Sequence, residues 1–515
     1  MDRTSYPMAR QATSTLWQET ISAPPILPSL RGQVEADVVI LGAGITGLTA
    51  AMYLKAAGQR VVVLEAGRVG SGTTGGTSAH LDAMPDQGAE QLIRDFGEST
   101  AGAVTRARMA AIAQIESWCR ELDIACDFRR VPAYLYSESA DRVSALEAEC
   151  EAARRLGLET TMVDRLDLPF AYGGFRIDNQ ARFHSLSYLY GLARRLRGEG
   201  VAIYEDSHAQ IPADGEPCVV ETGGGRVTAR NVLLCTHTSY MGVTAIDTLV
   251  APYQSYVLTA RVSDEVPDTL YWDDAEPYHY TRLASSEDPK LLVVGGADHK
   301  TGQGGDEREA MDRLERYVHE RFQVKSIEHR WSAELLEPSD GLPYVGRMWT
   351  TRNVMVGAGF SGTGLTFGSI AGKVLADLVL ERESPLAKIF SPARFKPLAG
   401  GPDYLAENLN VARRFVADRF SGDAVESLDE VRPGEGRLVR YKGQQWAMYR
   451  DQQGAVHVLS PVCTHAGCHV QWNEFENTWD CPCHGGRFSA LGERIYGPPP
   501  KNLEPKAIAD LESDQ

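Results

Sequence analysis

The chain has 515 residues, a length that predicts about three domains, because single hydrophobic cores stop growing well below it. Its 52 basic and 69 acidic side chains give a formal net charge of −17, and this acidic excess argues against nucleic acid or an anionic membrane as a partner. No apolar stretch approaches the roughly 20 residues of a membrane span and no signal-peptide pattern opens the sequence, so we expect a cytoplasmic protein without a membrane span.

Residues 1–36 predict a surface arm, because they are polar, then rich in proline, and show no sustained hydrophobic period. From Asp37 to about Glu383, strand-like and helix-like stretches alternate, which predicts an α/β sheet. The expected helices are 48–57, 104–122, 140–156, 186–197 and 307–322, and the expected strands are 38–41, 60–64, 232–235, 253–261, 291–295 and 353–356.

A glycine motif, Gly42-Ala43-Gly44-Ile45-Thr46-Gly47, lies between the first expected strand and a helix. The next strand ends in Glu65. Glycines at this spacing let the backbone approach a pyrophosphate at the helix N-terminus, and the acid at the end of the second strand is placed to hold a ribose hydroxyl. The alternative is a glycine turn without a ligand, but strand, turn, helix, strand and acid occur here in the expected order.

A second motif of the same form, Gly357-Ala358-Gly359-Phe360-Ser361-Gly362, also follows an apolar strand. It is a weaker candidate for a nicotinamide site, because no second strand with a terminal acid follows its helix. We interpret it as a helix N-terminus directed at another part of one flavin, since reduced flavin carries negative charge that such an end stabilises.

With these motifs, residues 37–383 resemble the D-amino-acid-oxidase-like (DAO) family of FAD-dependent oxidoreductases. The likeness includes Ser71-Gly72-Thr73-Thr74-Gly75-Gly76-Thr77, which passes near the flavin in that family, and the segments 232–236, 340–346 and 357–364. It implies bound FAD and a doubly wound FAD-binding domain, at 37–248 and 328–383, with a mixed-sheet substrate domain at 249–327. The expected FAD contacts are Gly42, Ala43, Gly44, Thr46, Gly47, Glu65, Thr73, Thr74, Gly359, Phe360, Ser361 and Gly362.

The candidate substrate-binding residues are of two kinds: one residue that differs from the family's usual residue, and three residues on one expected strand. Amino-acid oxidases of the family often place an arginine, which holds the substrate carboxylate, where this chain has Glu337 before a proline. An acid there would attract a cationic amine, unless a length difference shifts the comparison and Glu337 only pairs with an arginine. Alternation places Tyr278, Tyr280 and Arg282 on one strand face, which would line the flavin cavity or form ordinary core. We name no catalytic base.

A segment rich in proline and glycine at 384–424 contains one expected linker helix, at 404–420, and precedes short strands and turns at 425–515. Two loops follow there, Cys463-Thr464-His465-Ala466-Gly467-Cys468 and Cys481-Pro482-Cys483-His484-Gly485-Gly486. A Rieske centre binds one iron through two thiolates and the other through two imidazoles, and each loop offers one of each: Cys463 with His465, and Cys481 with His484. Zinc uses the same residue types, but the doubled loop favours the cluster.

Residues 429–511 resemble Rieske 2Fe–2S domains, which are small and all-β. Cys468 and Cys483 are left over, one in each loop, and we expect them to form a disulfide that clamps the loops. High-potential respiratory Rieske domains have a serine and a tyrosine where this chain has Gly486 and Phe488. Those hydroxyls donate hydrogen bonds to sulfur and stabilise the reduced cluster, so this cluster is predicted to have a lower potential.

A flavin takes up two electrons and a Rieske cluster carries one. We therefore expect an FAD-dependent dehydrogenase that oxidises a C–N bond of an amine or amino acid and sends electrons through the cluster to an external one-electron protein or a quinone. Two alternatives remain open. An external reductase could feed the flavin through the cluster, or the protein could be a non-catalytic electron carrier or redox sensor.

Overall fold

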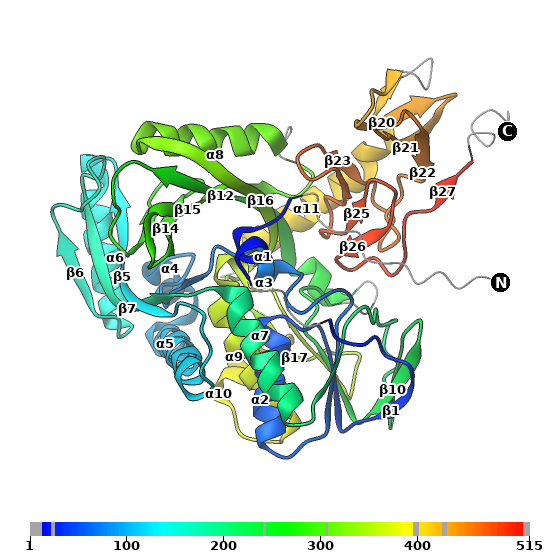
Figure 1. Cartoon of the computed structure of the whole chain (residues 1–515), viewed down its shortest axis with the longest axis horizontal. Helices are drawn as coiled ribbons and strands as arrows, with labels where there is room; N and C mark the ends of the chain where they lie inside the picture. The colour runs from blue at the N-terminus through cyan, green and yellow to red at the C-terminus, as the bar shows by residue number, and fades with distance from the viewer. Residues whose placement is uncertain are drawn as a thin grey trace.

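The computed structural model describes residues 13–21, 26–239, 241, 244–303, 307–394, 401–424 and 430–507. A mostly parallel sheet, a larger mixed sheet and a small β domain are arranged around one central region (Figure 1). The predicted helices and strands of the first 380 residues are present, with ends that differ by a few residues. None of the helices in the described part of the chain combines the length and the apolar character that crossing a membrane requires.

The first sheet carries both glycine motifs at the ends of its strands. Its order is β17 (Tyr344–Arg347), β18 (Val354–Ala358), β11 (Asn231–Leu234), β2 (Val38–Leu41), β3 (Val61–Leu64) and β8 (Ala202–Tyr204), and all neighbours pair in parallel except β17 with β18. The central strands are apolar runs buried on both faces, as in a helix-covered parallel sheet. The helices α2 (Ile45–Ala56), α7 (Ser185–Gly198) and α9 (Gly364–Val379) stand beside it, while β9 (Cys218–Glu221), β10 (Gly225–Ala229) and β1 (Gly32–Glu35) form a three-stranded sheet.

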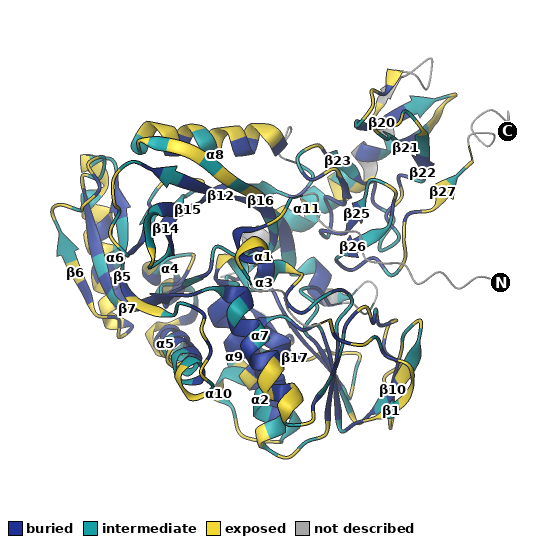
Figure 2. Ribbon diagram, in the orientation of Figure 1, coloured by how far each residue is buried: buried dark blue, intermediate teal, exposed yellow. Residues whose placement is uncertain are grey.

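The second sheet is larger than the substrate domain predicted at 249–327. Its order is β16 (Val324–Pro338), β12 (Val250–Val262), β15 (Asp288–Lys300), β14 (Tyr280–Ser285), β13 (Leu270–Asp273), β5 (Arg129–Ser137), β7 (Gly173–Arg182) and β4 (His80–Leu81), with β6 (Thr160–Val163) beside β7. The parallel pairing of β13 with β5 joins strands from 80–182 to those from 249–338, so neither part forms the sheet alone. Helix α8 (Glu307–Arg321) covers one face and exposes its outer side (Figure 2).

Five other helices of the described residues are short or lie at the edges of these layers. They are α3 (Thr73–Gly76), α4 (Ala89–Phe96), α5 (Glu98–Glu121), α6 (Val143–Arg155) and α10 (Pro385–Ile389), with 3-10 turns at Ala140–Arg142, Ala245–Thr248 (η2), Ser361–Thr363 and Asp418–Phe420. Of these, α3 and the turn at Ser361–Thr363 contribute to the functional site described below.

The expectation of a surface arm is wrong for Thr15, Leu16 and Trp17, which are buried. The short helix α1 (Leu16–Thr20) lies at the centre of the molecule, and its Trp17 is only 1% exposed. The Trp17 indole N–H donates to the Thr77 carbonyl at 2.6 Å, and the guanidinium carbon of Arg282 lies 5.0 Å from the centre of a Trp17 ring. A satisfied indole and a cation–π contact fix this segment in the interior. Residues 1–12 and 22–25 of the predicted arm lie outside the described residues.

The predicted linker helix is present as α11 (Gly401–Ala417), and after the 3-10 turn at Asp418–Phe420 the named elements of the described residues are β-strands. One small sheet has the order β19 (Asp423–Ala424), β20 (Gly436–Tyr441), β21 (Gln444–Arg450), β22 (Val456–Leu459) and β27 (Pro505–Lys506). The other has β23 (Gln471–Asn473), β24 (Thr478–Asp480), β25 (Arg487–Ser489) and β26 (Arg494–Tyr496). The second of these sheets lies nearer to β16 (Figure 1).

Candidate functional site

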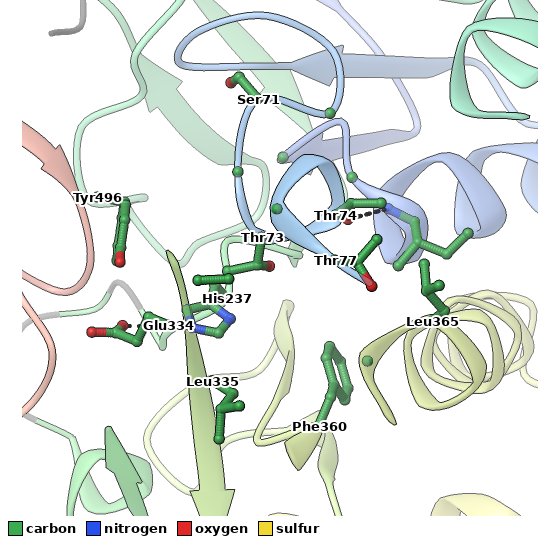
Figure 3. Close-up of a pocket in the computed structure, with 18 of the residues that line it drawn as sticks. Ser71, Thr73, Thr74, Thr77, His237, Glu334, Leu335, Phe360, Leu365 and Tyr496 are labelled. Atoms are coloured by element: carbon green, nitrogen blue, oxygen red, sulfur yellow. Dashed lines mark hydrogen bonds and ion pairs between the residues drawn. The ribbon is translucent and has the colours of Figure 1, made fainter. Parts of the chain in front are cut away.

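A cavity of about 910 Å³ lies between the two large sheets and reaches the C-terminal domain. Its wall is formed by both glycine motifs, the segment 64–78, strand β16 and the C-terminal residues 494–497, as well as residues of the N-terminal segment (Figure 3). This is the size of a site for a large cofactor. Cofactor motifs that lie more than 300 residues apart in the sequence therefore face one space.

The first glycine motif has room for backbone only. A Cβ at Gly42, where φ is +101°, would lie 2.3 Å from the Cys235 carbonyl oxygen, and one at Gly47 would lie 2.0 Å from the Gly42 carbonyl oxygen. Both approaches are to main-chain atoms, which cannot rotate away as a side chain can. Gly44 and Thr46, at the beginning of α2, line the cavity, so the helix N-terminus is open to an anionic group there.

Glu65 follows β3 and also lines the cavity. Its carboxylate accepts hydrogen bonds from the backbone N–H groups of Ala43, at 2.8 Å, and Gly67, at 2.9 Å. Burial raises the pKa of Glu65, while these backbone hydrogen bonds lower it. The acid is thus fixed beside the glycine turn, as a residue that holds a ribose hydroxyl would need to be.

The two other expected flavin segments meet at the same cavity. Thr73 and Thr74 lie on α3, and the Thr74 hydroxyl accepts a hydrogen bond from the Ile45 backbone N–H at 3.3 Å. Phe360, Ser361 and Gly362 line the cavity just before the first turn of α9, while Gly359, with φ of +72°, is in the turn before them. The second motif thus directs a helix N-terminus at the space shared with the first motif.

The substrate candidates do not all reach the cavity. Tyr278 and Tyr280 line it, and Glu337 lies directly behind the wall, where it accepts a hydrogen bond from the Ser361 hydroxyl. Arg282 is not among the described residues of the lining. Its guanidinium is fully buried and donates to the backbone carbonyls of Ser78, at 2.7 Å, and Leu283, at 2.9 Å, so it supports the wall from behind.

The structure adds three acids that the sequence analysis missed: Asp82 and Asp86, which line the cavity, and Asp298 on β15. Burial raises the pKa of Asp298 to about 7 and that of Glu337 to about 8, and the charge of Asp86 contributes to both increases. Burial also raises the pKa of Asp82 to about 6, although Arg108 pairs with it at 2.8 Å. No motif marks these acids, because they come from distant segments.

The C-terminal loops bring Cys463, His465, Cys481 and His484 together. The two imidazole rings are 4.8 Å apart and nearly perpendicular, at 85°. Both thiols are buried, and within the described residues His465 Nδ1 and Nε2 and His484 Nδ1 are buried without a hydrogen-bond partner. Two thiolates and two neutral imidazoles are the ligand set of a Rieske 2Fe–2S cluster, so these residues fit that group. The expected disulfide between Cys468 and Cys483 is present.

Gly486 and Phe488 stand where respiratory Rieske domains have a serine and a tyrosine, and their surroundings in the structure are apolar or filled. A Cβ at Gly486 would lie 3.6 Å from Cys463 Sγ but only 2.4 Å from Pro499 Cγ, so the proline occupies the space of a serine side chain. Phe488 is fully buried in the same apolar cluster as Cys463 and Cys481 and offers no hydroxyl.

We expect the cluster to have a midpoint potential well below the upper end of the Rieske range, which runs from roughly −150 to +300 mV. Phe488→Tyr should raise the potential, because a phenol that donates to sulfur stabilises the reduced state. An EPR-monitored redox titration measures both values. A wild-type potential near the upper end, or an unchanged potential in the tyrosine variant with an intact EPR signal, would contradict this account.

Comparison with known proteins assigns a family to each of the two parts of the chain. The family model for DAO, "FAD dependent oxidoreductase", matches residues 37–378, and the model for the Rieske [2Fe-2S] domain matches 423–507. The chain belongs to the DAO family. A protein of Bacillus subtilis (strain 168), "Putative Rieske 2Fe-2S iron-sulfur protein YhfW", is 34% identical over 502 residues, which are 96% of this chain and 98% of the relative. This DAO-family chain therefore carries a C-terminal Rieske domain.

Two further proteins match part of the chain. The gamma-glutamylputrescine oxidoreductase of Escherichia coli (strain K12) is 28% identical over 392 residues, which are 72% of this chain and 90% of the relative. The crystal structure of glycine oxidase from Geobacillus kaustophilus matches with a TM-score of 0.59 and 19% identity, over 70% of this chain and 99% of that one, and supports the fold. The protein is an oxidoreductase whose cofactors are FAD and a Rieske-type 2Fe–2S cluster.

Proposed function

We propose that this protein is an FAD-dependent dehydrogenase that oxidises a C–N bond of an amine or amino acid, with an amine the better fit. Its electrons leave one at a time through the Rieske cluster to an external one-electron protein or a quinone. The observation that carries the proposal is a single cavity with acids in one part of its wall and the C-terminal domain in another.

The acids support a substrate with a positive charge. Asp86, Asp298 and Glu337 influence one another electrostatically, and burial raises the pKa of each, although the charge of Arg108 lowers that of Asp86 in part. The arginines among the described residues of the lining are Arg68, in the segment after β3, and Arg494, in the C-terminal domain. When ionised, these carboxylates would attract a protonated amine and repel a substrate carboxylate.

The proposed reaction requires one proton transfer, because a bound ammonium group must lose a proton when the neighbouring carbon gives up a hydride, and an ionised carboxylate beside the cavity can accept that proton. The bound flavin supplies the chemistry of bond oxidation, since its ring accepts the hydride. The chain's own residues bind and orient the substrate: Asp86 and Glu337 attract its ammonium group, and the rings of Tyr278 and Tyr280 form an apolar wall beside it. The buried wall restricts water around the reacting carbon.

Glu337→Gln should raise KM for a cationic amine by about tenfold at pH 9, where the wild-type carboxyl is ionised. Because the pKa of Glu337 is raised to about 8, the wild-type residue is neutral below that pH and negative above it. Wild-type KM should therefore fall as pH rises through this range, and the variant should lose that dependence. Steady-state KM between pH 6.5 and 9.5, with an amine that stays protonated throughout, tests this.

The matched control is Glu328→Gln, on the same strand but at the surface, where the carboxylate pairs with Arg261. It should keep the wild-type profile. Equal KM values for wild type and Glu337→Gln across the whole pH range would show that this acid does not attract the substrate.

The function itself is tested by offering purified protein a panel of amines and amino acids without oxygen, while flavin absorbance and the EPR signal of the reduced cluster are followed. Flavin bleaching followed by cluster reduction is the expected result. If both centres are reduced only after an external reductase is added, electrons flow in the opposite direction, from the cluster to the flavin. A cluster that titrates reversibly while no substrate bleaches the flavin would instead favour an electron carrier or redox sensor.

A further inference from the structure

His465 and the residue that follows His484, in the two ligand loops, contact the flavin-binding part of the molecule. The His465 side chain is only 1% exposed, and its Nε2 lies 3.8 Å from Asp247 Oδ2, in η2. Gly485, directly after His484, lies against Glu334 of β16: a Cβ at Gly485 would be 2.5 Å from each oxygen of that carboxylate. Since Glu334 also lines the flavin cavity, one side chain touches both the cavity and a ligand loop.

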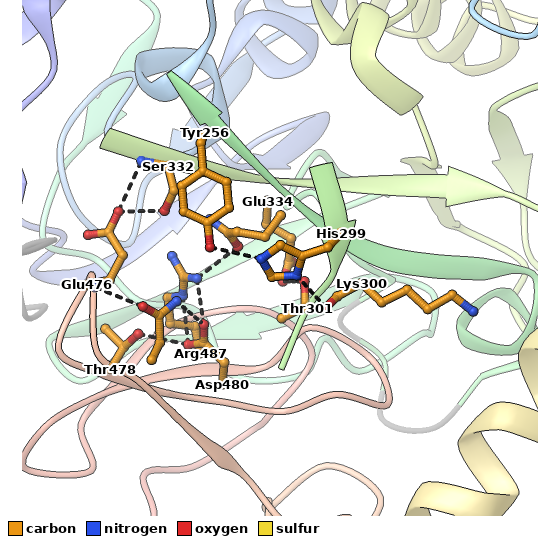
Figure 4. Close-up of polar contacts among 12 residues, drawn as sticks. Tyr256, His299, Lys300, Thr301, Ser332, Glu334, Glu476, Thr478, Asp480 and Arg487 are labelled. Atoms are coloured by element: carbon orange, nitrogen blue, oxygen red, sulfur yellow. Dashed lines mark hydrogen bonds and ion pairs between the residues drawn. The ribbon is translucent and has the colours of Figure 1, made fainter. Parts of the chain in front are cut away.

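Buried polar contacts hold the C-terminal domain in this position (Figure 4). Arg487 pairs with Asp480 in its own domain, at 2.6 Å, and donates to Gln254 Oε1 on β12, at 2.9 Å. Glu476 accepts hydrogen bonds from the backbone N–H of Ser332 on β16, at 3.1 Å, and from its hydroxyl, at 2.6 Å. Separating the domains would remove Gln254 as a partner of Arg487 and Ser332 as a partner of Glu476, so these contacts hold the two parts at a fixed spacing.

Glu334 has two polar neighbours in the cavity wall (Figure 3). His237 Nε2 lies 3.6 Å from Glu334 Oε1, slightly too far for a direct hydrogen bond, and the His237 and Tyr496 rings meet edge to face at 6.5 Å. Among the described residues, Glu334 Oε1, His237 Nε2 and Tyr496 Oη are buried and have no direct partner. Buried polar atoms of this kind are commonly joined by ordered water.

We propose that Glu334 is a positioning residue for electron transfer between the flavin and the cluster. With His237 and Tyr496 it forms a hydrogen-bonded bridge, closed by ordered water, that holds the 481–486 loop against the cavity wall. The step is the movement of one electron from the flavin to one iron of the cluster, which goes from the ferric to the ferrous state. The inference rests on the proposed function, since it assigns residues to the electron route named there.

Laser-flash photoreduction of the full-length holoprotein tests this without a substrate. A flash-generated deazaflavin radical delivers one electron to the protein, and absorbance follows its redistribution between the flavin and the cluster. Glu334→Ala should slow this internal step by at least about tenfold, because small displacements of reacting groups cost rate steeply. Glu334→Gln keeps the shape and hydrogen-bonding capacity of the side chain and should retain most of the wild-type rate.

Glu328→Ala, on the same strand and at the surface, is the control and should leave the rate unchanged. The EPR spectrum of the reduced cluster shows in every variant whether the cluster is intact. If Glu334→Ala does not keep both cofactors, Tyr496→Phe is the variant that tests the proposal. It removes a single oxygen and should still slow electron transfer severalfold.

Two negative results have different meanings. A wild-type protein in which no electron redistributes between the two centres would contradict the proposed function. A wild-type protein that transfers electrons, with rates in Glu334→Ala and Tyr496→Phe equal to that of Glu328→Ala, would overturn the role of Glu334 and leave the function standing. When Glu334→Ala cannot be measured, a rate in Tyr496→Phe equal to that of Glu328→Ala would also overturn the role of Glu334.

Discussion

Cys463→Ser should abolish the Rieske EPR signal while leaving reduction of the flavin by substrate in place. The Cys463 thiol is buried beside the second ligand loop, and a serine hydroxyl does not replace a thiolate on iron. Turnover with a one-electron acceptor should fall by at least about 100-fold, because even loss of groups outside the ligand shell costs 10- to 100-fold in metal sites. Iron content, EPR and anaerobic stopped-flow reduction of the flavin measure these effects separately.

The matched control is Cys150→Ser. This thiol is equally buried, but it lies on α6, and the variant should keep the cluster and the turnover. If Cys463→Ser still reduced the one-electron acceptor at the wild-type rate, the electrons would leave the flavin without the cluster, and the proposed route would be wrong.

Gly47→Ala should weaken the binding of FAD. The added Cβ would lie 2.0 Å from the Gly42 carbonyl oxygen and 3.2 Å from Ile40 Cγ2, so the turn between β2 and α2 would have to open. Overpacking of this kind costs roughly 1–3 kcal/mol, and about 1.4 kcal/mol corresponds to a tenfold loss of affinity. We expect FAD affinity at least about tenfold weaker, measured as the flavin-to-protein ratio after gel filtration and by titration of the apoprotein.

Gly198→Ala serves as the control for this substitution. Gly198 ends α7, a Cβ there would meet no atom within 4 Å, and alanine favours a helix. This variant should bind FAD normally and unfold at the same or a higher temperature. Normal FAD content in Gly47→Ala would show that the close approach of Gly42 to Gly47 is not needed for the cofactor.

Local spacing explains why both cofactors could be predicted. The glycine motif at 42–47 with Glu65, and the loops that contain Cys463 and Cys481, each lie within one short stretch of chain, where residue order largely determines geometry. The expected disulfide lies in the same loops. By contrast, α1 was expected at the surface, because its burial depends on Thr77 and Arg282, which are distant in sequence.

The amino-acid sequence by itself determined the Rieske loops, the flavin motifs and the alternation of strands and helices, since each depends on neighbours within about one supersecondary unit. Only the tertiary structure decided which acids lie near the substrate space: Asp86 lines the cavity, and its charge raises the pKa of Asp298 on β15 and of Glu337 on β16. The tertiary structure also shows that Arg282 lies behind the cavity wall and that Glu334 contacts Gly485. Contacts between distant segments depend on how the sheets pack, and packing leaves no local pattern in the sequence.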